Sequence, residues 1–281
     1  MATPYKTHAF YSRRVADDLH PEHARVAQYL REHHSTLRLS DTTEAEVLFV
    51  FGGDGTLLEA LRMRTERNPH IVAFNTGHTG FLSTVRDVER FIETIDRALN
   101  GSLTQMAIPV MQIVHHKNGI ATVFRGVDDV VVDCPMTWLT LRIESIDGDA
   151  PSFIKEIRGS GMCLCTAIGS TTPMAAHFQA PRIDPSVRAF FLKGIHDIVS
   201  PTTGIVLSGA SERTVRATLM KNEPNLGIPE AHRHPPSLFI DGAHAGTLDV
   251  GDALEISYLE QPSILLRLPE ETHWDRARSL K

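Results

Sequence analysis

Glycines, an aspartate and a threonine stand directly behind an apolar run in the segment FVFGGDGTLL, residues 49–58. Glycine permits backbone conformations with positive φ and carries no side chain, so a ligand can touch the backbone there. The free N–H groups at the start of a following helix attract anions, phosphate above all. A carboxylate in that place would repel phosphate, so Asp54 indicates a further task, such as taking a proton or holding a metal ion. The combination is typical of phosphoryl transfer.

The same segment has a plainer interpretation as a strand–turn–helix corner in which Asp54 acts as a helix N-cap. It is neither a Walker P-loop, because no GxxxxGK[ST] is present, nor a GxGxxG dinucleotide fingerprint. A second segment, FNTGHTGFL at residues 74–82, favours the functional interpretation because it also follows an apolar run. Two such turns in successive strand–helix units lie side by side at the edge of a parallel sheet where ligands bind.

The elements that must position these segments alternate between buried strands and amphipathic helices. Short apolar runs rich in Val and Phe are typical of strands buried on both faces, and apolar residues at helical spacing predict helices. The expected strands lie within residues 8–14, 45–51 and 70–75. The expected helices lie within residues 22–34, 56–67 and 87–101. This alternation predicts an N-terminal parallel α/β domain of Rossmann-like class over residues 1–102.

The sequence pattern changes near Ser102. From there to about residue 260 the apolar runs are short, alternating and β-branched, which is typical of antiparallel strands. Asn-Gly at 118–119 and Asp-Gly at 147–148 and 241–242 predict hairpin turns. We therefore predict a mainly β domain over residues 103–262. A strand and a short amphipathic helix are expected in residues 263–281, packing back on the first domain.

The composition bounds the function classes. The chain has 281 residues, 42% of them hydrophobic, and this length allows two domains of ordinary size. Its formal net charge of −6 argues against a dedicated nucleic-acid binder, since such proteins usually carry a basic face. Three cysteines without a CxxC pattern indicate buried thiols rather than a disulfide framework or a cysteine zinc site. The N-terminus has no apolar leader and no run approaches about 18 apolar residues, so we expect a cytoplasmic protein with no membrane partner.

The 15 histidines give no recognisable metal motif. His232 and His234 lack a nearby cysteine or an HExxH helix, so a solvated loop is expected there. His115 and His116 precede the Asn-Gly turn and are expected at the surface.

GGDGT followed by NTGHTGFL resembles the NAD kinase family, whose usual motifs are GGDGT and then NxGxxGFL. AIGSTTP at 167–173 resembles the family's TPTGSTAY stretch, and IDGAHAG with the closing LRLPEETHW resembles its tail. GGDGT alone is shared with lipid kinases and phosphofructokinases, but its pairing with NTGHTGFL is far more specific. The resemblance covers most of the chain, in order.

The resemblance implies a parallel α/β domain beside a β-rich NAD-binding domain, with the substrate between them. It implies transfer of the γ-phosphoryl group of ATP, or of polyphosphate in some members, to the 2′-hydroxyl of the adenosine ribose of NAD. It assigns Asp54 as the base that takes the proton from that hydroxyl, Mg²⁺ as a cofactor brought with ATP, and a homodimer or homotetramer as the assembly. No protein ligand for a metal is assigned.

The resemblance also implies a set of binding residues. The glycines of the first turn would let phosphates approach the backbone, Asn75 and Phe81 would line the NAD site, and the Gly-Ser-Thr stretch would lie near the adenosine. The matched substrate- and nucleotide-binding positions are Gly52, Gly53, Gly55, Thr56, Asn75, Gly80, Phe81, Asp128, Asp129, Ser160, Gly169, Ser170, Thr171 and Thr172.

Three departures from the family pattern fall on the NAD-binding side. GVDDV stands where the family has an ALNEV-like strand, so Asp128 replaces an amide with a carboxylate, which only accepts hydrogen bonds. Ser160 replaces the aspartate of the family's GDG, and Thr172-Pro173 replaces Ala-Tyr. Three interpretations remain: an NAD kinase with a divergent pocket, which we favour, a kinase of the same fold for another nucleotide or metabolite, and a non-catalytic NAD(P)- or ATP-binding regulator.

Overall fold

The computed structural model divides the chain into two compact units, Met1–Ile108 with Pro262–Lys281, and Pro109–Gln261. Each unit is considered by itself. The residues that the structure describes are 5–12, 21–63, 67–76, 82, 88–135, 137–147, 150–169, 184, 186–198, 205–208, 214–224 and 234–269.

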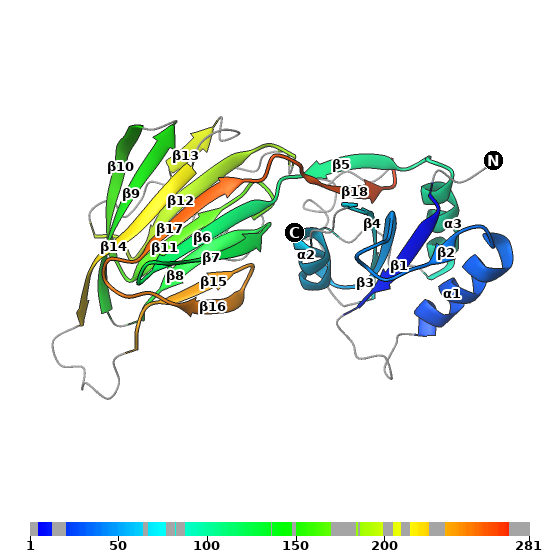
Figure 1. The fold of residues 1–281 in the computed structure, drawn as a ribbon, viewed down its shortest axis with the longest axis horizontal. Helices are drawn as coiled ribbons and strands as arrows, with labels where there is room; N and C mark the ends of the chain where they lie inside the picture. The colour runs from blue at the N-terminus through cyan, green and yellow to red at the C-terminus, as the bar shows by residue number, and fades with distance from the viewer. Residues whose placement is uncertain are drawn as a thin grey trace, which may run out of the picture. The chain divides into compact units, whose positions relative to one another are not determined.

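The first unit is built on a six-stranded sheet in the order β2-β1-β3-β4-β18-β5 (Figure 1). Its strands are β1 (Thr7–Tyr11), β2 (Arg38–Leu39), β3 (Val47–Gly52), β4 (His70–Asn75), β5 (Thr104–Ile108) and β18 (Ser263–Arg267). Its helices are α1 (Pro21–His33), α2 (Asp54–Arg62) and α3 (Val88–Leu99). The pairs β1–β2, β1–β3, β3–β4 and β4–β18 are parallel, whereas β5 runs antiparallel to β18. β18, which follows the second unit in the sequence, is thus inserted between β4 and β5.

Helices cover both faces of this sheet, which explains why the sequences of its central strands are continuously apolar. Successive side chains of a strand point to opposite faces. Phe49 and Phe51 pack in one cluster with Phe91 of α3, while α2 packs against β3, β4 and β18. Figure 1 shows α1 and α3 on one side of the sheet and α2 on the other. Gly101 follows α3 with φ +77°, the left-handed conformation typical of a helix stop.

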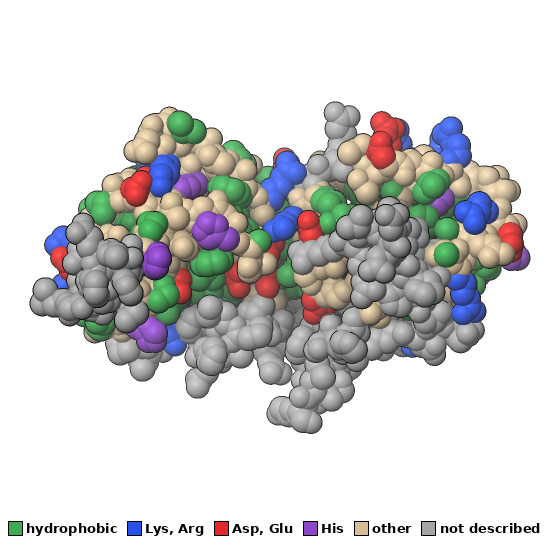
Figure 2. All heavy atoms as spheres, turned by 90° about the horizontal axis from the view of Figure 1, so that it is seen from below, with side chains coloured by type: hydrophobic (Ala, Val, Ile, Leu, Met, Phe, Trp, Pro, Cys, Tyr) green, Lys and Arg blue, Asp and Glu red, His purple; other side chains and the backbone are tan. Residues whose placement is uncertain are grey.

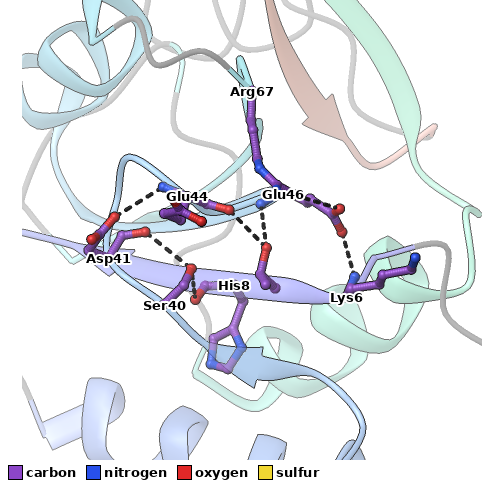
Figure 3. Close-up of polar contacts among 8 residues, drawn as sticks. Lys6, His8, Ser40, Asp41, Glu44, Glu46 and Arg67 are labelled. Carbon is purple, nitrogen blue, oxygen red and sulfur yellow. Dashed lines mark hydrogen bonds and ion pairs between the residues drawn. The ribbon is translucent and has the colours of Figure 1, made fainter.

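Charged side chains tie the amino ends of β1 and β3 together (Figure 3). The Glu46 carboxylate accepts the Lys6 backbone N–H at 2.5 Å and pairs with the Arg67 guanidinium at 3.2 Å. The Thr7 hydroxyl donates to the Glu44 carbonyl at 3.0 Å and accepts the Glu46 N–H at 3.1 Å. The polar groups at this edge of the sheet therefore satisfy one another.

The described residues of the second unit form two antiparallel six-stranded sheets, in the orders β10-β9-β14-β17-β6-β7 and β13-β12-β11-β8-β15-β16. The first contains β6 (Met111–Lys117), β7 (Ile120–Gly126), β9 (Thr137–Asp147), β10 (Ala150–Gly159), β14 (Thr214–Pro224) and β17 (Ala253–Tyr258). The second contains β8 (Asp129–Asp133), β11 (Gly161–Cys165), β12 (Ala189–Ile195), β13 (Ile205–Ser208), β15 (Ser237–Ile240) and β16 (Ala243–Thr247). Apolar side chains from both sheets form one core cluster, the arrangement of a β-sandwich.

The predicted fold class is confirmed: a parallel sheet with helices is followed by antiparallel β-sheets. The hairpin signals are also borne out where both turn residues are described. Asn118 and Gly119 have φ values of 52° and 77° between β6 and β7, and Asp241 and Gly242 have 50° and 74° between β15 and β16. Two successive positive φ values are the mark of a type I′ turn.

One surface prediction is wrong. His115 is 6% exposed and its Nε2 lies 3.3 Å from Oδ2 of buried Asp252. Side chains alternate along β6, so His115 points into the core on the same face as Met111 and Ile113, while His116 points outward to Glu255. The adjacent turn residues predict exposure, but the alternation of side chains along β6 determines which histidine is buried.

The remaining surface and composition findings concern the described residues. Cys134, Cys163 and Cys165 are free and buried, as expected. None of the described helices has the length and apolar character that crossing a membrane requires. On the face shown in Figure 2, acidic, basic and histidine side chains are interspersed over each unit.

Candidate active site

The first glycine segment forms a tight corner at the carboxyl end of β3. The strand ends at Gly52, and α2 begins at Asp54 with Gly53 as its N-cap, which provides no side-chain cap. The Gly53 carbonyl accepts the N–H groups of Thr56 and Leu57 at 3.0 and 3.2 Å. Asp54 is therefore the first helical residue, and the plainer interpretation of it as the N-cap is wrong.

The Asp54 carboxylate joins the two glycine segments. Its Oδ1 accepts the backbone N–H of Leu82 at 3.1 Å, and Leu82 is the last residue of NTGHTGFL. Asp54 is half-buried at the N-terminus of α2, where the helix dipole favours negative charge. The Asp54 carboxylate therefore lies at the positive end of α2, where a phosphate group would also bind.

Gly52 is required by close packing. A Cβ atom placed on it would lie 2.4 Å from the Thr56 Oγ1 and 2.6 Å from the Thr56 Cβ, and Thr56 is buried. The corner can turn this sharply only because position 52 has no side chain. Gly55 is exposed in the first turn of α2.

The two glycine segments start side by side, as predicted from the parallel arrangement. Gly52 is opposite Asn75 in the β3–β4 ladder, so both strands reach their carboxyl ends together. Asn75 is 3% exposed. Gly80 and Phe81, which the sequence also assigns to this site, lie outside the described residues.

A second group of assigned residues gathers in the other unit, at the turn between β7 and β8. The Thr166 hydroxyl donates to the Val127 carbonyl at 2.7 Å and accepts the Gly169 N–H at 3.2 Å, while the Thr166 N–H donates to the Asp128 carbonyl at 2.9 Å. A Cβ atom on Gly169 would lie 2.2 Å from that carbonyl oxygen. The structure thus brings Asp128, Asp129 and Gly169 together.

The electrostatics of Asp129 set it apart from ordinary surface carboxylates. Burial raises its pKa to about 6, with a further contribution from the negative charge of Asp241, while a hydrogen bond from the Gly242 backbone N–H opposes the shift. Asp129 is 7% exposed, and among the described residues its Oδ1 has no hydrogen-bond partner. A buried acceptor without a partner is costly, and it is the kind of group that a ligand donor satisfies.

Ser160 lies elsewhere in the second unit. Gly161 pairs with Asp133, whereas Cys165 pairs with Asp129 at the other end of the same two strands. Four residues of strand separate the two ends, about 13 Å at the usual rise. The Ser160 Oγ lies 3.1 Å from the His196 Nδ1. The structure therefore does not bring Ser160 into the Asp128–Gly169 group.

Three further assigned residues, Ser170, Thr171 and Thr172, lie outside the described residues. Within the described part of the chain, no group of three or more His, Cys, Asp or Glu side chains is arranged to hold a metal ion.

Comparison with known proteins shows what the chain resembles. Residues 5–103 match the sequence profile of the ATP-NAD kinase N-terminal domain. The NAD kinase of Symbiobacterium thermophilum is 23% identical over 236 residues, which cover 84% of this chain and 78% of that protein. The NAD kinase of Thiobacillus denitrificans is 27% identical over 241 residues, 84% of this chain and 76% of that protein.

Residues 5–103 therefore carry the N-terminal domain of an ATP-NAD kinase. Solved structures show that the chain has the NAD kinase fold. Yeast NADH kinase, complexed with NADH, superposes with a TM-score of 0.79 at 17% identity, covering 99% of this chain and 86% of that one. The NAD kinase from Archaeoglobus fulgidus, in complex with ATP, has a TM-score of 0.69 at 18% identity, with 97% of each chain covered.

One residue was missed as a candidate site residue. Asp241 was assigned only to a hairpin turn and to the IDGAHAG motif, yet its carboxylate reaches the β7–β8 turn that carries Asp128 and Asp129. The available signal was the aspartate at the first turn position, whose side chain can accept backbone N–H groups. Which segment would supply those N–H groups could not be deduced from local sequence.

Proposed function

We propose that this protein transfers the γ-phosphoryl group of ATP to the 2′-hydroxyl of the adenosine ribose of NAD, giving NADP. The ATP-NAD kinase N-terminal domain at residues 5–103 and the similarity to NAD kinases over most of the chain support the proposal. The observation that carries it is the geometry of Asp54, a carboxylate on the first residue of a helix, behind a glycine corner and bonded to the second glycine segment.

Asp54 is the proposed general base. A ribose hydroxyl is a poor nucleophile and loses its proton as it attacks, so a positioned carboxylate accelerates the step by roughly 10²–10⁴-fold. The ribose oxygen bonds to the γ-phosphorus as the bond from that phosphorus to the bridging oxygen of ADP breaks. The proton passes to Asp54, and ADP leaves.

The glycine corner is proposed to hold the phosphates of the donor. Gly53 and Gly55 flank Asp54 with backbone N–H groups and no side chains, and the N-terminus of α2 adds a positive partial charge. Mg²⁺ enters with ATP as part of that substrate, and it offsets the repulsion between the phosphates and Asp54. The archaeal relative solved with ATP supports this choice of donor.

The turn that carries Asp128 and Asp129 is proposed to recognise the nucleotide acceptor, with Gly169 packed against it. Carboxylates accept hydrogen bonds, so they suit the amino and hydroxyl groups of an adenosine. The remaining acceptor contacts are proposed at Asn75, Phe81, Ser160, Ser170, Thr171 and Thr172. A homodimer or homotetramer is the proposed assembly.

A second candidate is a kinase of the same fold with a different acceptor. It is favoured by the exchange of the family's Asn-Glu pair for Asp128-Asp129 and by the distance of Ser160 from that pair. In this version Asp54 keeps its role, and the acceptor is another nucleotide or a small metabolite that offers hydrogen-bond donors to two carboxylates. A non-catalytic regulator is the third alternative.

The deciding experiment supplies purified protein with ATP, Mg²⁺ and a panel of acceptors that includes NAD, NADH, adenosine nucleotides and sugar phosphates. ADP release reports transfer to any acceptor, and NADP is measured separately. NADP formed from NAD supports the proposal, whereas ADP release with another acceptor alone supports the second candidate. Thermal stabilisation by NADP or ATP with no product from any acceptor would indicate the regulator.

A further inference from the structure

The carboxylate of Asp241 holds three successive backbone N–H groups from a segment more than a hundred positions earlier in the chain. It accepts the Val127 N–H at 3.0 and 3.1 Å from its two oxygens, the Asp128 N–H at 2.8 Å and the Asp129 N–H at 3.4 Å. The Asp241 N–H in turn donates to the Asp129 carbonyl at 3.1 Å. The β15–β16 hairpin is thereby tied to the β7–β8 turn at four backbone groups.

Successive N–H groups that point at one position make an anion-binding concavity. Here the anion is supplied by the chain itself, so this concavity serves to fix the turn. Close packing completes the restraint. A Cβ atom on Gly126 would lie 2.8 Å from Ile240 Cγ2 and 3.3 Å from the Asp241 Oδ1. Thr166 and Gly169 hold the turn from another side.

The restrained turn carries one buried carboxylate that can still accept a hydrogen bond. Asp129 is 7% exposed, and its Oδ1 has no hydrogen-bond partner among the described residues. Among the described residues, the ionisable groups around it are Asp241 from the β15–β16 hairpin, Asp128 from its own turn and Cys163 from β11. All are acidic, so none supplies a positive partner, and a neutral or positive donor is the ligand chemistry that the position suits.

We propose that Asp241 is a positioning residue, which holds the Val127–Asp129 turn so that the Asp129 Oδ1 meets a hydroxyl or amino donor of the nucleotide that receives the phosphoryl group. The inference rests on the proposed function, because it takes Asp129 as part of the acceptor site. It assigns Asp241 no contact with substrate.

The charge of Asp241 has a second effect. It contributes to raising the pKa of Asp129 to about 6, so its removal moves the ionisation of Asp129 to lower pH. Acceptor binding that uses ionised Asp129 weakens as the pH falls through about 6 in the wild type. In a variant without the Asp241 charge, the same weakening occurs at lower pH.

Asp241→Asn is the informative variant. Asn-Gly occupies the type I′ turn at 118–119 of this same chain, so the substitution preserves the hairpin. It removes the negative charge and turns one of the two acceptor oxygens into an N–H₂ donor that faces backbone N–H. The reverse exchange, Asn118→Asp, is the matched control, because it makes Asp-Gly in the same turn type at a position outside the proposed site.

In the kinase assay, Asp241→Asn is expected to raise the KM for NAD about tenfold, since charge-assisted hydrogen bonds that orient Asp129 are lost. The kcat and the KM for ATP are expected to stay within about twofold. The inflection in the pH profile of the NAD KM moves to lower pH, and Asn118→Asp leaves every value unchanged. A purely structural role would lower activity without shifting that inflection.

Hydrogen exchange tests the positioning without activity. The amides of residues 127–129 are expected to exchange faster in Asp241→Asn than in the wild type, and at wild-type rate in Asn118→Asp. Faster exchange together with an unchanged NAD KM and pH profile overturns the inference, as does unchanged exchange.

If the wild type makes no NADP, the proposed function fails on its own account, and calorimetric titration with NAD then decides the inference. Weaker NAD binding by Asp241→Asn than by the wild type supports it. Equal affinity, or no binding by either protein, overturns it.

Discussion

The amino and carboxyl ends of β1, β3 and β4 belong to one sheet, but they are built from different kinds of residue. At the amino end, the Glu46 carboxylate accepts the Lys6 backbone N–H and pairs with the Arg67 guanidinium, so the polar groups face one another. At the carboxyl end, β3 runs into Gly52 and Gly53, and α2 starts without a side-chain cap. One edge is closed by contacts within the chain, and the other presents backbone N–H groups and a carboxylate.

The difference teaches how to tell a structural charge from a functional one. Carboxylates at both edges accept backbone N–H groups, so a hydrogen bond alone does not separate them. Asp54 differs because it lies where the helix dipole and the glycine corner favour a bound anion. The carboxyl edge of a parallel sheet is also where α/β folds bind their ligands. Four predictions test this contrast.

The largest effect is expected at Asp54. Asp54→Asn keeps the size of the side chain and removes the base, so the rate of NADP formation falls at least about 100-fold. The midpoint of thermal unfolding stays close to that of the wild type. Asp41→Asn, in the exposed loop before β3, is the matched control, because the Asp41 carboxylate accepts the N–H groups of Thr43 and Glu44 and the Thr43 hydroxyl. An Asp54→Asn protein with wild-type turnover would refute the assignment of Asp54 as the base.

Acid should weaken the first sheet through His8. Burial lowers the pKa of His8 from 6.5 to about 4. The unfolded chain binds the proton near pH 6.5 and the folded chain only near pH 4, so stability is lost as the pH falls between these values. The loss is on the order of 3 kcal/mol. Urea unfolding at pH 7 and pH 4.5 measures it, and His8→Phe is expected to lose less. Parallel losses in the two proteins would contradict the assignment to His8.

A smaller loss of stability is expected from Gly52→Ala. The added Cβ lies 2.4 Å from the Thr56 Oγ1, so the corner or the start of α2 must shift, at a cost of about 1–3 kcal/mol. Because the shift moves Asp54 as well, turnover falls together with the urea midpoint. If this variant is as stable as the wild type, the corner has more room around position 52 than the contact with Thr56 indicates.

The smallest effect is expected at the amino edge. Glu46 pairs with a half-exposed Arg67, and such pairs contribute roughly 0–1 kcal/mol. Glu46→Gln is therefore expected to lower the free energy of unfolding by under about 1 kcal/mol and to leave NADP formation unchanged. A loss of activity greater than the loss of folded protein would contradict the purely structural role of the amino edge.

Much of this fold follows from local sequence, and the exceptions are long-range. The apolar runs of β3 and β4, the amphipathic α3 and the type I′ turns were all predicted, because each depends on a few neighbouring residues. The insertion of β18 between β4 and β5 depends on pairing partners nearly 200 residues apart. His115 was misplaced for a related reason, since its neighbour Asp252 is distant in sequence.

The candidate site shows the same limit. The juxtaposition of Gly52 and Asn75 was predicted, because two parallel strands end at one edge. The link from Asp241 to residues 127–129 was not, because a hairpin signal specifies the turn and leaves the target of its side chain open. Residue types thus located the glycine corner at Asp54, but they did not identify the residues that hold Asp129 in place.

The insertion of β18 between β4 and β5 has a consequence for the order in which the chain folds during synthesis. The polypeptide leaves the first sheet after β5 and returns only at residues 263–267, when the strands of the second unit have already been made. Until then β4 has an open, apolar edge, and such edges recruit other strands or chaperones. Translation therefore finishes the sandwich before the first sheet, and a stop codon ahead of residue 263 would release a protein whose first sheet lacks β18.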